Sequence, residues 1–126
     1  MNIDRCPSTL VPGFTSYSPA GLRKLFDGKK VSPILPYVAP DIHGEPEEFL
    51  ENREHISISG VQEKLSVLVD QGTIRLTKSG EQGTHLLKPI SSRLARASDM
   101  PANEHVTMQI AAQLFGISTA PNGLCF

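Results

Sequence analysis

The chain of 126 residues is long enough for one small domain, and its 39% of hydrophobic residues can form a core. Its formal net charge of −1 gives no overall positive field, which argues against direct binding to nucleic acid or to an anionic membrane surface. No apolar run reaches the length of a signal-peptide core or a membrane span, so we expect a cytoplasmic protein. Cys6 and Cys125 lie near opposite ends and fit neither a zinc site nor a disulfide scaffold, so we expect two free, buried thiols.

The first predicted element is a short helix at about residues 19–26. Ser18 can cap its free amide groups, Pro19 fits its first position, and Asp27 followed by glycine ends it. The apolar face of this helix consists of Leu22, Leu25 and Phe26. Residues 1–17 should form an irregular arm that lays a few apolar side chains on the body of the protein.

Prolines recur throughout residues 31–46 and predict a loop or an extended connection there. A basic cluster precedes this connection and an acidic, helical segment follows it. The basic residues are Arg23, Lys24, Lys29 and Lys30, and the acidic residues are Glu47, Glu48 and Glu51. We expect both to be solvated surfaces. The alternatives are a phosphate or nucleic-acid contact for the basic cluster and a metal ion for the acidic one.

A small polar loop at residues 57–60 leads into an apolar, β-rich run. Ser57, Ser59 and Gly60 are small enough to let the backbone approach a bound group closely. Gly60 can also adopt backbone dihedrals that are closed to other residues. We interpret this segment as a ligand-facing loop attached to a strand.

Three strands are predicted after this loop. Residues 64–69 alternate weakly between apolar and polar, and residues 73–77 resume the alternation after a turn at residues 70–72, which together predict an antiparallel hairpin. A third strand at residues 84–88 is stopped by Pro89. The inward side chains of the hairpin would be Leu65, Val67, Val69, Ile74 and Leu76.

Lys88 ends the third strand, where it is either a charge in water or a fixed cation aimed at a ligand anion. The strongest helix pattern follows at about residues 102–115, with Pro101 in its first turn and a glycine at its end. Its apolar face would consist of Val106, Met108, Ile110, Ala111, Ala112, Leu114 and Phe115. Glu104 lies near its beginning, where the helix dipole favours a carboxylate, so the residue needs no functional explanation by itself. Residues 123–126 begin a further apolar strand.

This order of a hairpin, a strand ending in lysine, a helix with an early glutamate and another strand resembles the amino-terminal lobe of protein kinases. Three strings sharpen the resemblance: S-I-S-G-V-Q-E-K-L from Ser57, L-L-K-P from Leu86 and P-A-N-E-H-V-T-M from Pro101. They resemble the HipA family of bacterial serine/threonine kinases over roughly residues 15–126. Because the chain lacks the extra amino-terminal subdomain of HipA, it looks more like HipT of the three-gene HipBST systems, in which HipS supplies that subdomain.

The resemblance implies binding of ATP with Mg²⁺ by the complete kinase. We expect only very weak binding by this chain alone, because adenine in kinases is held between two lobes and this chain provides one of them. The loop that covers the ATP phosphates would contain Ser57, Ile58, Ser59 and Gly60, with a single glycine where G-x-G-x-x-G is usual. Lys88 would contact the nucleotide phosphates, and Glu104 would hold this lysine in an ion pair. The two loop serines would be autophosphorylation sites, since a phosphoserine beside the triphosphate would repel it and displace the loop.

The resemblance also implies partners and a division of the chain. A HipB-like antitoxin, a HipS-like small protein and a protein substrate such as an aminoacyl-tRNA synthetase would interact with the complete kinase. Residues 1–55 would form the arm, the short helix and the connection, and residues 56–126 a kinase lobe truncated before the hinge. Because the catalytic carboxylate and the Mg²⁺ ligands belong to the other lobe, we expect neither catalytic nor metal-binding residues in this fragment, and no phosphate transfer by it alone.

Two other hypotheses stay open. One is a stand-alone, non-catalytic interaction module that pairs with a kinase or an antitoxin, and co-purification with a separately encoded carboxy-terminal lobe would favour it. The other is a small α+β domain with a structural serine loop and a solvated Lys88. Unchanged nucleotide and partner binding after Ser57→Ala or Lys88→Ala would favour this second alternative.

Overall fold

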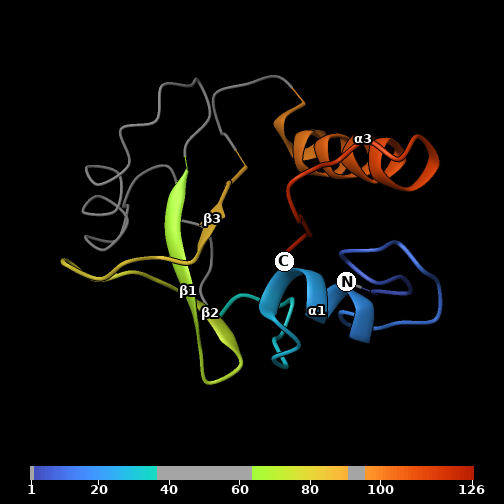
Figure 1. The fold of residues 1–126 in the computed structure, drawn as a ribbon. Coiled ribbons are helices and arrows are strands. Elements are labelled where there is room, and N and C mark those ends of the chain that lie inside the picture. Colours follow the sequence, from blue (N-terminus) through green and yellow to red (C-terminus); the bar gives the residue numbers. More distant parts are fainter. Residues whose placement is uncertain (1, 37–63, 91–95) are drawn as a thin grey trace.

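The computed structural model describes residues 2–36, 64–90 and 96–126. In these parts the protein has the expected α+β architecture, with two α-helices and a three-stranded antiparallel sheet (Figure 1). The elements are α1 (Pro19–Phe26), β1 (Leu65–Asp70), β2 (Thr73–Leu76), β3 (His85–Leu87), the 3-10 helix η1 (Ala97–Asp99) and α3 (Met100–Leu114). The predicted short helix, hairpin, third strand and long helix are therefore confirmed to within a few residues at each end.

The sheet has the strand order β2-β1-β3, so β1 is its central strand. Val69 lies opposite Ile74 in the hairpin, and Leu65 lies opposite Leu87 where β1 pairs with β3. The hairpin turn has positive φ at both central residues, 48° at Gln71 and 79° at Gly72. This pair of dihedrals is typical of the type I′ turn, whose twist matches that of the two strands.

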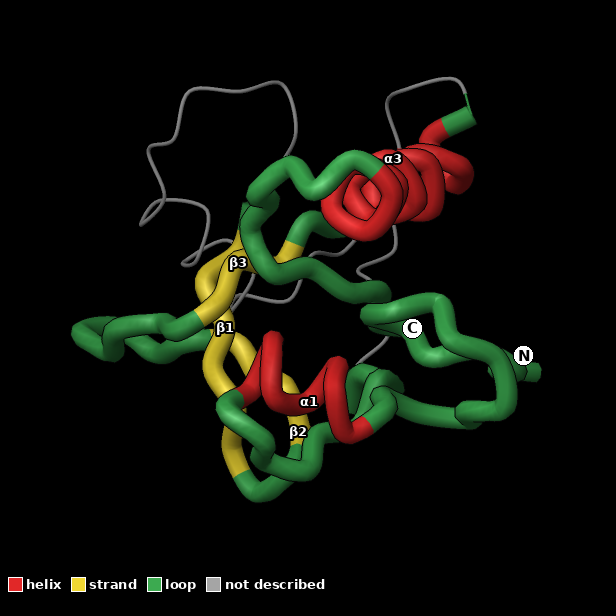
Figure 2. The backbone as a smooth tube through the Cα atoms, turned by 45° about the vertical axis from the view of Figure 1, so that its right-hand side comes forward, coloured by secondary structure: helices red, strands yellow, loops and turns green. Residues whose placement is uncertain are grey.

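Helix α1 covers one face of the sheet (Figure 2). The Ser18 side chain accepts a hydrogen bond from the Gly21 amide, and Asp27 ends the helix in a left-handed conformation, as the capping pattern predicted. The buried core combines the inward strand residues with residues from α1 and its flanks: Tyr17, Phe26, Val31, Leu65, Val67, Ile74 and Leu76. A ring nitrogen of His85 lies 2.6 Å from the Leu25 carbonyl oxygen, which joins α1 to β3 by a hydrogen bond.

The amino-terminal arm packs against the start of α1, where Cys6 is completely buried, as expected. Its sulfur accepts hydrogen bonds from the Ser18 and Thr9 amides, at 3.1 and 3.4 Å. Burial raises the pKa of the Cys6 thiol, but hydrogen bonds from Ser18 and Thr9 outweigh burial and bring the pKa to about 7. Both cysteines are free, as expected, although Cys125 is only half-buried.

The strand expected at residues 123–126 is not present. This segment is extended but bonds to two separate loops: the Leu124 amide donates to the Pro7 carbonyl, and the Phe126 amide donates to the Pro33 carbonyl. The Leu35 amide returns a bond to the Phe126 carbonyl. Because its partners are loops, the segment joins the arm to the connection after α1 without extending the sheet, and the two ends of the chain lie close together (Figure 1).

The predicted apolar face of α3 is wrong in part: Met108, Ala111 and Ala112 are half-buried, but the other members are exposed. The buried residues of this helix are His105 and Gln109, whereas Val106 and Ile110 are 42% and 44% exposed and Leu114 is 77% exposed. Phe115, just beyond the helix, is 73% exposed. The physical reason is that α3 faces polar groups of the arm and of residues 120–122, so its polar side chains turn inward.

Several sequence predictions lie outside the described residues, namely most of the proline-rich connection, the acidic segment and the loop at residues 57–60. The basic residues Arg23, Lys24, Lys29 and Lys30 are exposed, which agrees with a solvated surface. Within the described ranges, no helix is long and apolar enough to cross a membrane.

Arg75 of β2 forms ion pairs with two carboxylates at the protein surface. Its guanidinium group binds both carboxylate oxygens of Glu81 at 2.8 Å and also Asp70 at 2.8 Å. Together with the Lys78 amide, this guanidinium lowers the pKa of Glu81 from 4.5 to about 2. The folded protein therefore holds this carboxylate ionised at a pH where the unfolded chain binds a proton, and the resulting stabilisation is lost on acidification.

We predict that Glu81→Gln lowers the free energy of unfolding at neutral pH. The difference between wild type and variant should stay constant above about pH 5 and shrink as the pH falls from about 4.5 towards 2. Urea unfolding at a series of pH values measures this difference. A difference in the free energy of unfolding that is the same at pH 6 and pH 2.5 would contradict the stabilising role of the ionised Glu81 carboxylate.

Candidate functional site

The candidate site lies at the end of the sheet where β1 begins and β3 ends. Leu65, the first residue of β1, is opposite Leu87, the last residue of β3, and Lys88 follows directly. Pro89 cannot donate a backbone hydrogen bond, so the strand pairing stops here. Lys88 is thereby held at the edge of the sheet.

Glu104 approaches Lys88 from α3. The Lys88 ammonium group and the Glu104 carboxylate form an ion pair and a hydrogen bond. The side chains of Lys88 and Glu104 are 37% and 41% exposed, so the pair lies at the surface and remains accessible to a ligand. The contact that the kinase resemblance implied is present, while a role of either residue in nucleotide binding stays a prediction.

The other predicted site residues are not placed by the structure. Ser57, Ile58, Ser59 and Gly60 lie outside the described residues, and their role as a loop over a nucleotide stays a prediction. The described part of the site is thus one cation, Lys88, with its carboxylate partner. Such a pair can direct a positive charge towards an anionic ligand, because the carboxylate fixes where the ammonium group points.

Behind Glu104, α3 is attached through a partly buried polar cluster that sequence reasoning missed. Asn122 Oδ1 lies 2.6 Å from His105 Nδ1 and accepts a hydrogen bond from Gln109 Nε2 at 3.0 Å. Gln113 Nε2 donates to the Thr9 carbonyl oxygen at 3.0 Å and to Gln109 Oε1 at 2.8 Å. The signal available in the sequence was the polar stripe His105, Gln109 and Gln113, spaced four residues apart on a helix.

His105 is buried without a full set of partners. Its Nε2 atom has no hydrogen-bond partner among the described residues. Burial lowers the pKa of His105, and the hydrogen bond with Asn122 offsets this only in part. The imidazole is therefore held in its neutral form at neutral pH, which avoids an unpaired charge inside the protein.

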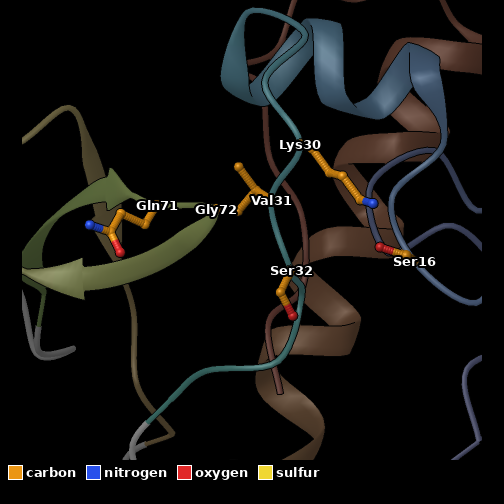
Figure 3. Close-up of a pocket in the computed structure, with 6 residues that line it drawn as sticks. All are labelled: Ser16, Lys30, Val31, Ser32, Gln71 and Gly72. Atoms are coloured by element: carbon orange, nitrogen blue, oxygen red, sulfur yellow. The ribbon is translucent and has the colours of Figure 1, made fainter.

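A shallow pocket of about 630 Å³ lies at the other end of β1, beside the hairpin turn (Figure 3). It is lined by Ser16, Lys30, Val31, Ser32, Gln71 and Gly72. Figure 3 shows the Gln71 side chain pointing away from Lys30 and Ser16, so the polar groups do not converge on one point. The pocket also contains none of the predicted site residues. A binding site usually places a few polar groups around one position, and this pocket does not.

The described ranges contain no group of three or more His, Cys, Asp or Glu residues that could hold a metal ion. In a comparison with protein families, the model of the HipA-like C-terminal domain matches residues 56–125, more than half of the chain. These residues include the whole sheet, α3, Lys88 and Glu104. No curated protein matches the sequence.

We predict that the Lys88–Glu104 pair contributes little to stability. Exposed ion pairs typically contribute about 0.2–1 kcal/mol. A double-mutant cycle of Lys88→Met and Glu104→Gln, followed by urea unfolding, should therefore give a favourable coupling free energy of about 1 kcal/mol or less. The coupling should weaken with added salt, because both side chains are solvated. A coupling of several kcal/mol, or one of the opposite sign, would contradict this description.

Proposed function

The chain belongs to the family of HipA-like C-terminal domains, and from this premise we propose that it is the nucleotide-covering lobe of a HipA-like serine/threonine kinase of the HipT type. In this proposal the lobe binds the phosphates of ATP and presents them to a second lobe, which carries out the transfer. The substrate of the complete kinase would be a protein, such as an aminoacyl-tRNA synthetase.

The ion pair between Lys88 and Glu104 is the observation that carries this proposal. In protein kinases, a lysine on the third strand of the lobe contacts the nucleotide phosphates, and a glutamate from the following helix fixes the lysine. Here a lysine at the end of β3 is paired with a glutamate of α3, within the residues that match the family. The partial exposure of both side chains leaves room for a phosphate oxygen beside the ammonium group.

The serine loop supports the proposal through its position in the sequence. Residues 57–60 precede β1 by a few residues, and β1 begins at the end of the sheet where Lys88 lies. We propose that the backbone of this loop, with Gly60 as its single glycine, covers the same phosphates that Lys88 contacts. Phosphorylation of Ser57 or Ser59 would then place about two negative charges against the nucleotide and weaken its binding.

A phosphate-binding role is compatible with the chemistry of the described residues. Lys88 supplies a cation for the phosphates, whereas the described ranges hold no acidic or histidine cluster for Mg²⁺. We therefore propose that Mg²⁺ would be held by the nucleotide phosphates and by groups of the second lobe. When bound, the ion would neutralise phosphate charge during transfer.

A second candidate function is that of a non-catalytic interaction module. The observation in its favour is the exposed apolar stripe of α3, formed by Val106, Ile110 and Leu114. By family resemblance its partners would be a HipB-like antitoxin or a HipS-like protein. Binding of a partner with equal affinity to the wild type and to Lys88→Met, without any nucleotide binding, would favour this function.

We predict that Lys88→Met weakens binding of Mg·ATP by about ten- to a hundredfold, because a charge-assisted hydrogen bond to phosphate contributes roughly 1.5–3 kcal/mol. Isothermal titration or NMR titration measures this affinity. Lys29→Met is a matched control, since Lys29 is an exposed lysine after α1 and far along the chain from the site. Adenosine, which lacks phosphates, should bind wild type and Lys88→Met equally. Equal losses in the two lysine variants would contradict a specific phosphate contact.

A further inference from the structure

Helix α3 is attached to the rest of the protein by its polar side, which makes its orientation depend on a few directed contacts. His105 is 3% exposed and Gln109 is 9% exposed. Apolar packing tolerates rotation of a helix, but hydrogen bonds require particular distances and angles. The residues that receive these bonds therefore decide which way α3 is turned about its axis.

Asn122 is the common partner of both buried side chains. Its Oδ1 atom is an acceptor, so we assign the donating proton of His105 to Nδ1, at 2.6 Å, while Gln109 Nε2 donates at 3.0 Å. Asn122 is itself fixed from two sides. Its Nδ2 donates to the Ala120 carbonyl oxygen at 2.9 Å, and Ser8 Oγ donates to its backbone carbonyl oxygen at 3.1 Å.

His105 directly follows Glu104, so the contact of one fixes the direction of the other. Successive residues of an α-helix point about 100° apart around the axis. With His105 held against Asn122, Glu104 is directed towards Lys88 at the edge of the sheet. The Lys88–Glu104 pair has little influence on the orientation of α3 in return, because the pair is partly exposed and such pairs stabilise little.

We propose that Asn122 is a positioning residue for the candidate site. By holding His105 and Gln109, it sets the rotation of α3 that brings Glu104 to Lys88. A second consequence, which rests on the proposed function, is that Asn122 affects the affinity for nucleotide phosphates although it does not touch them.

The test measures the coupling between Lys88 and Glu104 in two backgrounds. The cycle of Lys88→Met and Glu104→Gln is run by urea unfolding in the wild type and again in Asn122→Ala. In the wild type the coupling should change the unfolding equilibrium constant by a factor of about two to five. In Asn122→Ala this factor should fall to one. An unchanged factor would overturn the proposal.

Two variants separate positioning from a general loss of stability. Ile74→Val shortens a buried core residue of β2 and should lower stability without changing the coupling, whereas Asn122→Asp keeps an acceptor for both donors and should retain the coupling. If Asn122→Ala does not fold, Gln109→Met removes one of the two bonds to Asn122, together with the bond from Gln113 to Gln109, and should reduce the coupling. Equal loss of coupling in Ile74→Val and Asn122→Ala would contradict a specific role of Asn122.

Binding of Mg·ATP tests the second consequence separately. Asn122→Ala and Glu104→Gln should lower the affinity by the same factor, and the double variant should show no further loss. Additive losses would overturn this consequence. Absence of nucleotide binding in the wild type would contradict the proposed function, and the coupling cycle, which needs no nucleotide, would still decide whether Asn122 positions Glu104.

Discussion

The antiparallel pairing of β1 with β3 is the constraint on which the candidate site depends. Leu65 and Val67 are buried in the core beneath α1, and a shift of one residue in the register would turn both to the opposite face of the sheet. The core therefore fixes the register, and the register fixes the point at which Lys88 leaves the sheet. In this way the packing of ordinary apolar side chains determines where the one cation of the described site lies.

Elements with local signals could be predicted from the sequence. Ser18, Pro19 and Asp27 mark both ends of α1, and alternation of apolar residues marks the hairpin, so the structure differs from these expectations only at the element ends. The position of Lys88 at a strand end was equally visible. Its pairing with Glu104 was not, because the two residues are 16 positions apart and the residues alone left a solvated lysine as an alternative. The family resemblance supplied that expectation.

The orientation of α3 could not be predicted, because its partners lie outside the helix, in the arm and in the loop that follows the helix. An apolar stripe at helical spacing normally turns inward, and Val106, Ile110 and Leu114 form such a stripe. Here the groups that α3 meets are the carbonyl of Thr9 and the side chain of Asn122, which are polar. The cost of leaving these groups and His105 without hydrogen bonds outweighs the exposure of a few apolar side chains. Nothing in the neighbourhood of Asn122 in the sequence marks it as their partner.

The contact between the two ends of the chain has a consequence for the order of folding. The hydroxyl of Ser8 bonds to the carbonyl of Asn122 across 114 residues, and the Leu124 amide bonds to Pro7 beside it. The hairpin can form as soon as its own residues have been synthesised, since its contacts are local. Ser8 and Pro7, in contrast, lack these partners until residues 122–124 have left the ribosome, and closing so long a loop carries an entropic cost. Pro7 and Ser8 therefore complete these contacts late, whereas the neighbouring Cys6, whose partners Thr9 and Ser18 are local, can be held early in folding.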